Sequence, residues 1–370
     1  MVVKYTNELL KGICAKLQLQ PNKYQLANER YHTIADIIER DNAFKGVHLQ
    51  LYPHGSFRLK TTVKPLQSNE YDLDFVVEIP STTKMNPREL YDHVARILSS
   101  DGNHQGMVEK KTRCIRVNYS NDFHMDIMPG QSIGSGTTEI IVPDKELKAW
   151  YHHSNPKAYA MWFEMQAKTN INAEMSALKK AAVEPLTEQE MALRLEPLRQ
   201  AVQLIKRYRD VYCDAHDKTP VRSIVICTLM GYISSSYSNT IDIIGDFCTY
   251  VNGRIAGAFG EPFEVRNPVV DEVLTEKWKE SKSNYTDFVA MMAELTSDVK
   301  RLQELSVNTD ISTLIKKMFG ESITTEVIKE NSQGIANARA TGKLAAGANG
   351  LLSTEGLGTA VRSNHFYGED

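Results

Sequence analysis

The segment HGSFRLKTTVKPLQSNEYDLDFVVEI (residues 54–79) constrains the fold more than any other part of the sequence. A Gly-Ser pair precedes a run of β-branched and aromatic residues, and this run carries two aspartates one residue apart. Such residues favour strands, in which side chains i and i+2 project from the same face. The run is therefore predicted to be a strand with Asp72 and Asp74 on one face and apolar neighbours buried on the other.

A third aspartate lies in FHMDIM, a second predicted strand, at Asp126. Clustered carboxylates repel one another unless cations compensate them, and oxygen-only ligands favour Mg²⁺ or Mn²⁺ over zinc. Three carboxylates can hold two metal ions about 3.5–4 Å apart, an arrangement that supports in-line displacement at phosphorus. Asp72, Asp74 and Asp126 are thus predicted to be catalytic and to bind two Mg²⁺ ions, with Mn²⁺ as a substitute.

Four further residues are candidates for binding a nucleotide. Gly55 allows a close backbone approach and Ser56 adds a hydroxyl, so the pair can hold phosphate oxygens; the alternative is a plain loop before a helix. Lys206 in LRQAVQLIKRYRD can pair with phosphates as a point charge, or can be a solvated charge beside its two arginine neighbours. Ser223 opens an apolar helix, where it can meet the same phosphates or act only as an N-cap.

The pattern of apolar residues predicts an α+β fold. Residues 5–18 and 21–42 have helical spacing and are expected to form a helical hairpin, so that 1–45 braces the molecule. Short β-branched runs between 47 and 143 predict a sheet, interrupted by a helix over 87–98 with Asn86 as its N-cap.

After Trp150 the strand signals end and helical patterns dominate, at residues 156–168, 187–213, 222–236, 269–281 and 284–304. We therefore expect a mixed-sheet catalytic core over 46–150 and a helical domain over 151–330 that completes the nucleotide pocket. The active site is expected in the cleft between them. Residues 331–370 are rich in Gly, Ala, Ser and Thr and are predicted to be a mobile or draped tail.

Composition limits the partners and the compartment. The formal net charge of −3 argues against strong nucleic-acid binding, which depends on many Lys and Arg contacts to phosphates. The five cysteines are scattered, without a C-x-x-C pair, and suit a reducing cytoplasm. No signal peptide and no run of roughly 18 apolar residues is present, so a cytoplasmic protein without a membrane partner is expected.

Several other features are interpreted without a ligand. GQSIGSGT (residues 130–137) lacks the lysine of a P-loop and is predicted to be a hairpin loop. The His152-His153 pair lacks a third metal ligand nearby in the sequence. The aromatic residues could stack on a base, but their spacing is more typical of domain-interface core; they are Tyr151, Tyr159, Trp162 and Phe163.

The sequence resembles the cGAS/DncV-like nucleotidyltransferases, the bacterial CD-NTases, which belong to the polymerase-β-like superfamily. The resemblance covers most of residues 45–235 and rests on HGSFRLKTTVKP, YDLDFVVEI, HMDIMPG, NPKAYAMWF, IKRYRD and RSIVICTL. It implies that Gly55 and Ser56 hold a triphosphate and that Lys206 and Ser223 contact phosphates. It also implies that the three aspartates bind metal. Relatives often have Gln before Gly-Ser, where this chain has His54.

By the same resemblance, such enzymes join nucleoside triphosphates, ATP and also GTP, UTP or CTP, into a cyclic di- or trinucleotide. The product acts on a separate effector in antiphage defence (CBASS), and some systems modify the C-terminus of the enzyme. Two alternatives remain open from the residues. One is a template-independent enzyme that adds nucleotides to an RNA end, and the other is a catalytically silent nucleotide-binding regulator.

Overall fold

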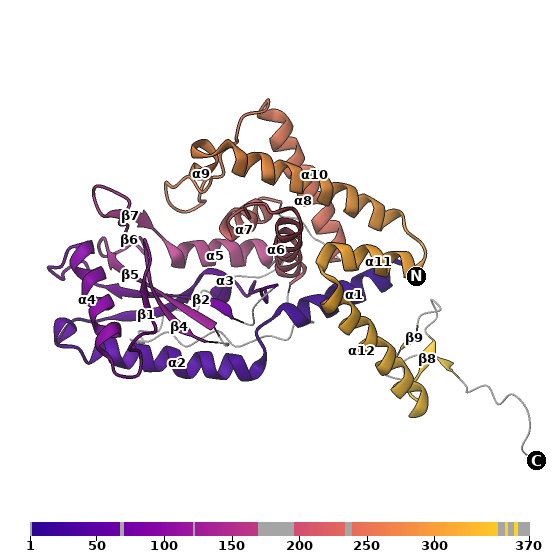
Figure 1. The fold of residues 1–370 in the computed structure, drawn as a ribbon, viewed down its shortest axis with the longest axis horizontal. Helices are drawn as coiled ribbons and strands as arrows, with labels where there is room; N and C mark the ends of the chain where they lie inside the picture. The colour runs from indigo at the N-terminus through magenta and orange to yellow at the C-terminus, as the bar shows by residue number, and fades with distance from the viewer. Residues whose placement is uncertain are drawn as a thin grey trace, which may run out of the picture.

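The computed structural model describes residues 2–66, 70–120, 123–168, 196–233, 239–346, 352–353 and 359–361. The chain forms two joined bodies, which are a mixed β-sheet with flanking helices and a second body built of helices (Figure 1). We call them the sheet body and the helical body. This architecture confirms the predicted α+β class.

The sheet is centred on two parallel strands. Its order is β1-β2-β5-β4-β3, and β6 extends it by pairing with both β5 and β7. β2 and β5 are parallel, and the other described strand pairs of this sheet are antiparallel. The strands are β1 (Gln50–His54), β2 (Tyr71–Ile79), β3 (Val108–Lys110), β4 (Ile115–Tyr119), β5 (Phe123–Ser132), β6 (Ile140–Pro143) and β7 (Tyr151–Ser154).

One face of the sheet is covered by α2 (Pro21–Glu39) and α4 (Pro87–Ser100), with a short 3-10 helix, Asn42–Phe44, between α2 and β1. Alternate residues of β2, among them Leu73 and Phe75, are buried in the core on this side. The Asn86 side chain accepts from the Glu89 backbone N–H and the Glu89 carboxylate accepts from the Asn86 N–H. This capping box confirms the predicted helix and its N-cap.

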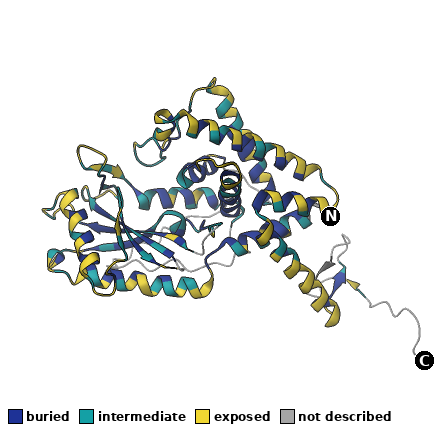
Figure 2. Ribbon diagram, viewed as in Figure 1, coloured by how far each residue is buried: buried dark blue, intermediate teal, exposed yellow. Residues whose placement is uncertain are grey.

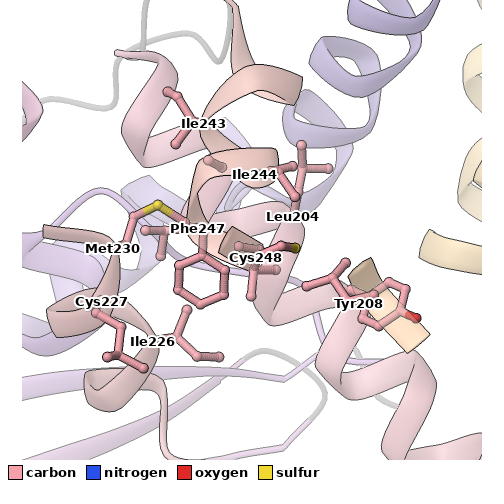
Figure 3. Packing of buried hydrophobic residues seen from close by; sticks show 14 of the residues in the cluster. Leu204, Tyr208, Ile226, Cys227, Met230, Ile243, Ile244, Phe247 and Cys248 are labelled. Carbon is pink, nitrogen blue, oxygen red and sulfur yellow. The ribbon is translucent and has the colours of Figure 1, made fainter. Parts of the chain in front are cut away.

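The helical body is built around α6 (Pro197–His216) and α7 (Ser223–Gly231). Leu204 and Tyr208 of α6 pack with Ile226 of α7 and Phe247 of α8 in its core (Figure 3), and Figure 2 shows α7 largely buried while α12 has long exposed stretches. Its helices are α1 (Val2–Leu17), α5 (Pro156–Ala167), α6 (Pro197–His216), α7 (Ser223–Gly231), α8 (Thr240–Gly257), α9 (Glu276–Glu280), α10 (Lys282–Glu304), α11 (Asn308–Phe319) and α12 (Glu321–Ala340). None of the helices in the described part of the chain combines the length and the apolar character needed to cross a membrane.

The first two helices are divided between the two bodies instead of forming the predicted hairpin. α1 packs on α6, α11 and α12, and its Leu9 and Ile13 are buried in the core of the helical body. α2 packs on α4, and its Tyr31 and Ile38 are buried in the core of the sheet body. Each helix has one apolar face, and helical periodicity alone does not indicate which partner covers it.

Other element boundaries differ from the sequence predictions. Strand structure continues past Trp150 into β7. The helix predicted over 269–281 is limited to α9, because the chain turns within 263–275, where the Asn267 N–H donates to the Glu272 carbonyl. Helices α8 and α11 were not expected. α12 includes residues 331–340 of the predicted tail, and the tail also contributes β8 (Ala345–Ala346), β9 (Leu352–Ser353) and β10 (Thr359–Ala360) to a small sheet. Residues 187–195 and 234–236 of two predicted helices lie outside the described residues.

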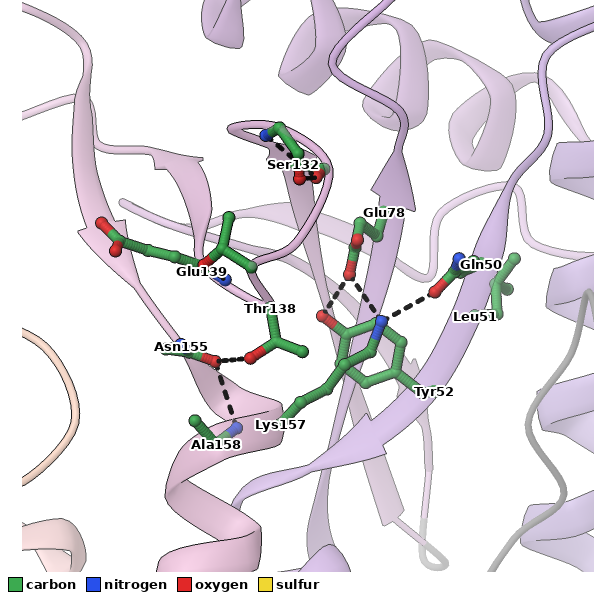
Figure 4. Close-up of polar contacts among 12 residues, drawn as sticks. Gln50, Leu51, Tyr52, Glu78, Ser132, Thr138, Glu139, Asn155, Lys157 and Ala158 are labelled. Carbon is green, nitrogen blue, oxygen red and sulfur yellow. Dashed lines mark hydrogen bonds and ion pairs between the residues drawn. The ribbon is translucent and has the colours of Figure 1, made fainter. Parts of the chain in front are cut away.

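A polar network joins α5 to the sheet (Figure 4). Lys157 Nζ donates to Gln50 Oε1 at 2.7 Å and to Glu78 Oε2 at 3.0 Å, and it lies 4.2 Å from the centre of the Tyr52 ring. The Tyr52 hydroxyl donates to the same Glu78 oxygen at 2.8 Å. A lysine that bonds to two strands at once fixes the start of α5 relative to the sheet, and α5 leads from there into the helical body.

Candidate active site

The three candidate aspartates lie together on the sheet face opposite α2 and α4. Asp74 of β2 and Asp126 of β5 are registered neighbours on the parallel strands, and Asp72 lies opposite His124. The predicted alternation is confirmed, since Leu73 is buried behind the pair. The Asp72 side chain is 62% exposed and that of Asp126 is 15% exposed, so the cluster extends from the protein interior to solvent.

The charges of this cluster interact strongly. Burial, together with the negative charges of Asp126 and Asp72, raises the pKa of Asp74 to about 7. Asp72 is more exposed, but partial loss of its contact with water and the negative charge of Asp126 raise its pKa, while the nearby Arg116 lowers it. A carboxyl group with so high a pKa is one that the protein destabilises in its ionised form and that a bound cation would stabilise.

Arg116 of β4 is a member of the site that the sequence analysis missed. Its Nε donates to Asp126 Oδ1 at 2.7 Å, and its Nη2 donates to Asp126 Oδ2 at 2.8 Å and to Asp72 Oδ1 at 3.1 Å. The Cys114 thiol also hydrogen-bonds to Asp126, and its burial raises the thiol pKa. The alternation of RCIRVNY predicts a strand and is the one signal for Arg116 in the sequence. Arg116 reaches the aspartates because this strand pairs with β5, where Arg116 lies opposite Asp126.

The donor set fits a hard divalent cation. All three candidate ligands are carboxylates, and Gly55 lies so close to Asp74 that an added Cβ would be 2.1 Å from Asp74 Oδ2. Oxygen ligands of this kind suit Mg²⁺ or Mn²⁺. Among the described residues no three His, Cys, Asp or Glu side chains already form a complete metal-binding group, and Arg116 engages both oxygens of Asp126. A cation would therefore share Asp126 with Arg116 or displace it.

The Gly55-Ser56 pair begins α3 (Gly55–Arg58) directly after β1, as a turn beside the aspartates. Gly55 has a φ of +60°, in the left-handed region that glycine tolerates best. Ser56 is half-buried, and its carbonyl accepts from the Thr61 N–H at 2.9 Å. His54 pairs with Asp74 across the strands, and burial lowers its pKa to about 4, so it is neutral at pH 7.

Lys206 and Ser223 both have protein partners. Lys206 is buried, and its Nζ donates to the Thr61 carbonyl at 3.0 Å and to Thr61 Oγ1 at 3.1 Å. It is close enough to Asp74 for its charge to lower the pKa of that carboxyl. Ser223 begins α7, and its Oγ accepts from Arg209 Nη1 at 3.0 Å. The solvated-charge interpretation of Lys206 is therefore wrong.

The aromatic residues after Trp150 divide between core and surface. Tyr159 and Phe163 are buried in the core of the helical body, and the Tyr159 hydroxyl is 2.8 Å from Thr228 Oγ1. Trp162 packs on Tyr232, with ring centres 5.7 Å apart. Tyr151 is 38% exposed. The core interpretation is confirmed for Tyr159 and Phe163.

The loop GQSIGSGT behaves as predicted, because β5 and β6 are antiparallel neighbours on either side of it. His153 Nδ1 pairs with Glu139 at 2.5 Å, and His152 Nδ1 lies 3.6 Å from Asp144 Oδ2. Both histidines thus belong to the β6–β7 edge and lie outside the aspartate cluster.

The chain is similar in sequence to proteins named as synthases of second-messenger nucleotides. A model of the "Second Messenger Oligonucleotide or Dinucleotide Synthetase domain" matches residues 5–167. A protein of Roseivirga ehrenbergii named "c-di-GMP synthase" is 28% identical over 369 residues, which is 98% of this chain and 97% of the relative. "Cyclic dinucleotide synthase CdnG" of Bradyrhizobium diazoefficiens is 24% identical over 348 residues, covering 88% of this chain and 83% of the relative.

Solved structures share the fold. The CD-NTase CdnG of Bradyrhizobium diazoefficiens, in complex with GTP, superposes with a TM-score of 0.72 at 22% identity, over 88% of this chain and 99% of that one. The DncV cyclic AMP-GMP synthase of Vibrio cholerae, bound to a linear intermediate, gives a TM-score of 0.54 at 18% identity, over 88% and 89% of the two chains. With its Gly-Ser turn, its paired aspartate strands and its helical body, this chain shares the fold of the cGAS/DncV-like nucleotidyltransferases, and its residues 5–167 match the synthetase domain.

Proposed function

We propose that the protein is a divalent-cation-dependent synthase that joins nucleoside triphosphates into a cyclic dinucleotide, with GTP as its first substrate to test. The observation that carries the proposal is the convergence of Asp72, Asp74 and Asp126 on one sheet face, next to the Gly55-Ser56 turn. The choice of GTP is supported by the name of the Roseivirga ehrenbergii relative, which matches this chain almost end to end. The two-nucleotide ring is supported by the names of both relatives. A three-nucleotide ring is the nearest variant of the same chemistry.

In the proposed reaction, a ribose hydroxyl oxygen of one nucleotide bonds to the α-phosphorus of the other while the bond to the β-phosphate oxygen breaks. The hydroxyl proton passes to Asp126, and pyrophosphate leaves. Two Mg²⁺ ions, when bound, would lower the pKa of the hydroxyl and neutralise charge on the phosphates. A second transfer within the linear intermediate then closes the ring.

The residues of the chain divide this work by position. Asp72 and Asp74 would hold cations together with Asp126, and the Ser56 hydroxyl would donate to the triphosphate. Ser223, at the start of α7, would meet the same phosphates from the helical body, and Lys206 would add positive charge nearby. We place the reaction in the cytosol, where the cyclic product would act on a separate effector in antiphage defence. Residues 362–370, where a C-terminal modification would occur, lie outside the described residues.

The test is product analysis. Purified protein is incubated with Mg²⁺ and each of the four triphosphates, alone and in pairs, and the products are identified by mass spectrometry after phosphatase treatment. We expect a phosphatase-resistant cyclic dinucleotide from GTP and release of pyrophosphate. Asp74→Asn, which keeps the shape of the side chain, should lose at least about 10³-fold in rate, because a cation ligand is lost. Its circular dichroism spectrum should match that of the wild type.

Three outcomes would contradict the proposal in different ways. Extension of an added RNA end, without a cyclic product, would indicate a template-independent polymerase. Magnesium-dependent binding of nucleotide without pyrophosphate release would indicate a silent regulator. Full product formation by Asp74→Asn would remove the aspartates from the mechanism.

A further inference from the structure

One face of α6 donates a row of hydrogen bonds to the loop of residues 59–64. Gln203 Nε2 donates to the Thr62 carbonyl at 3.0 Å, and Lys206 Nζ donates to the Thr61 carbonyl at 3.0 Å. Arg199 Nη1 donates to the Leu59 carbonyl, and Arg207 Nη1 donates to the Lys64 carbonyl at 3.3 Å. Positions 199, 203, 206 and 207 follow the helical repeat, so these donors share one side of the helix. We call them the α6 donor row.

These donors are buried, so the groups to which they donate show what the donors hold in place. Gln203 is 0% exposed, and Arg199 and Lys206 are each 3% exposed. Buried polar and charged groups destabilise a protein unless they are hydrogen-bonded, and an apolar helix face would pack here without that requirement. The loop needs such partners, because residues 61–65 belong to no helix or strand and their carbonyls are not satisfied by regular structure.

The loop that they hold supports the Gly-Ser turn. The Leu59 N–H donates to the Gly55 carbonyl at 3.1 Å, and the Thr61 N–H donates to the Ser56 carbonyl at 2.9 Å. Lys60 between them has a φ of +55°, an unfavourable conformation for a residue with a side chain. The turn is therefore supported from behind by a loop whose shape depends on α6, a helix of the other body.

We propose that the α6 donor row positions the triphosphate-binding turn, with Gln203 and Lys206 as positioning residues that act through the backbone of residues 59–62. The inference rests on the proposed function, because it takes Ser56 as a triphosphate contact. It assigns Lys206 the role of holding Thr61 in place, through the two hydrogen bonds that Lys206 Nζ donates to this residue. It also makes nucleotide affinity depend on how the helical body docks on the sheet body.

The chain offers a matched control for Gln203. Gln200 lies on the same helix and is 2% exposed, but its Oε1 accepts from Thr240 Oγ1 of α8 at 3.0 Å. Gln203→Met and Gln200→Met each remove a buried hydrogen-bonding side chain with little change in volume. Only the first deletes a bond to the loop behind the turn.

The experiment measures the dissociation constant of a non-hydrolysable GTP analogue in the presence of Mg²⁺, together with KM and kcat. Both variants should show similar decreases in melting temperature. In Gln203→Met the dissociation constant and KM should increase by about tenfold or more with a small change in kcat, whereas Gln200→Met should keep wild-type values. Mn²⁺ binding without nucleotide, measured by electron paramagnetic resonance, should be unchanged in both.

A second pair of variants applies if Gln203→Met does not fold. Thr61→Val removes the Oγ1 that accepts from Lys206, and Thr62→Val, one residue on, leaves the carbonyl that accepts from Gln203. We expect weaker analogue binding in Thr61→Val only. Equal affinity losses in the two members of either pair, unchanged affinity in both, or an equal loss of Mn²⁺ binding would overturn the positioning role. Absence of analogue binding by the wild type would instead contradict the proposed function.

Discussion

At the scale of single residues, Gly55 is the point at which the turn and the aspartate strand meet. A methyl group there would lie 2.1 Å from Asp74 Oδ2, and the φ of +60° disfavours any side chain. We expect Gly55→Ala to lose Mn²⁺ binding and synthesis and to melt at a lower temperature, because Asp74 must move. Gly134→Ala, where nothing lies within 4 Å of the added Cβ, is the control. Wild-type Mn²⁺ affinity in Gly55→Ala would show that the close contact is unimportant.

Asp74 should also give the stability of the protein an unusual dependence on pH. Its pKa rises from 3.8 to about 7 on folding, so between these values the folded state binds a proton that the unfolded state has lost. The free energy of unfolding should therefore decrease as pH rises through this window, and the raised pKa of Asp72 acts in the same direction.

The measurement is urea denaturation in EDTA at pH 5 and pH 7. The decrease between the two should be smaller in Asp74→Asn, and Mg²⁺ added at pH 7 should restore stability to the wild type more than to the variant. Equal decreases in the two proteins would mean that Asp74 ionises without cost in the folded state.

At the scale of elements, the contact between α1 and α12 is unusually close. An added Cβ on Gly12 would lie 2.4 Å from Val327 Cγ1. Gly→Ala in a helix normally stabilises by up to about 1 kcal/mol, but here we expect Gly12→Ala to destabilise by about 1–3 kcal/mol through overpacking. Val327→Ala should partly rescue it, so that the double variant is more stable than the sum of the single effects predicts. Chemical denaturation of all four proteins measures this coupling, and strict additivity would contradict it.

Local patterns predicted the elements that carry their own signal. Alternation along β2 placed Asp72 and Asp74 correctly opposite the core, and the Asn86 capping box marked the start of α4. The sequence patterns do not predict α8, although it buries Ile244 and Phe247. Residues 331–340 of α12 are predicted as tail because residues 331–370 as a whole are rich in Gly, Ala, Ser and Thr. Helix formation in these segments depends on the packing of a few apolar residues, which composition averages conceal.

The candidate site could be predicted only in part, for a related physical reason. The aspartates and the Gly-Ser pair form short motifs whose geometry follows from strand alternation and a turn. Arg116 and Thr61 join the site through pairings across strands and between bodies, which a single sequence does not encode locally. The burial of Lys206 has the same origin, since basic residues on helices are usually solvated.

At the scale of the whole molecule, the two bodies are held together by polar contacts as well as by packing. Lys157 fastens α5 to β1 and β2, and the α6 donor row fastens the loop behind the Gly-Ser turn. Both sets of contacts involve groups that are largely buried, and such groups tolerate little displacement before their hydrogen bonds are lost. We therefore expect the two bodies to keep their relative position before any nucleotide binds.

The position of α1 decides how the protein can be divided for laboratory use. A recombinant piece that stops near Ala167 would keep this first helix but lose the later helices that cover it. It would then expose an apolar stripe on α1, made of Leu9, Leu10, Ile13 and Leu17. A piece that starts at Pro197 would lack α1, so the apolar surface of α6, α11 and α12 that α1 covers would be exposed. Neither half is a sound truncation, and crystallographers or engineers should express the chain from its first helix through α12.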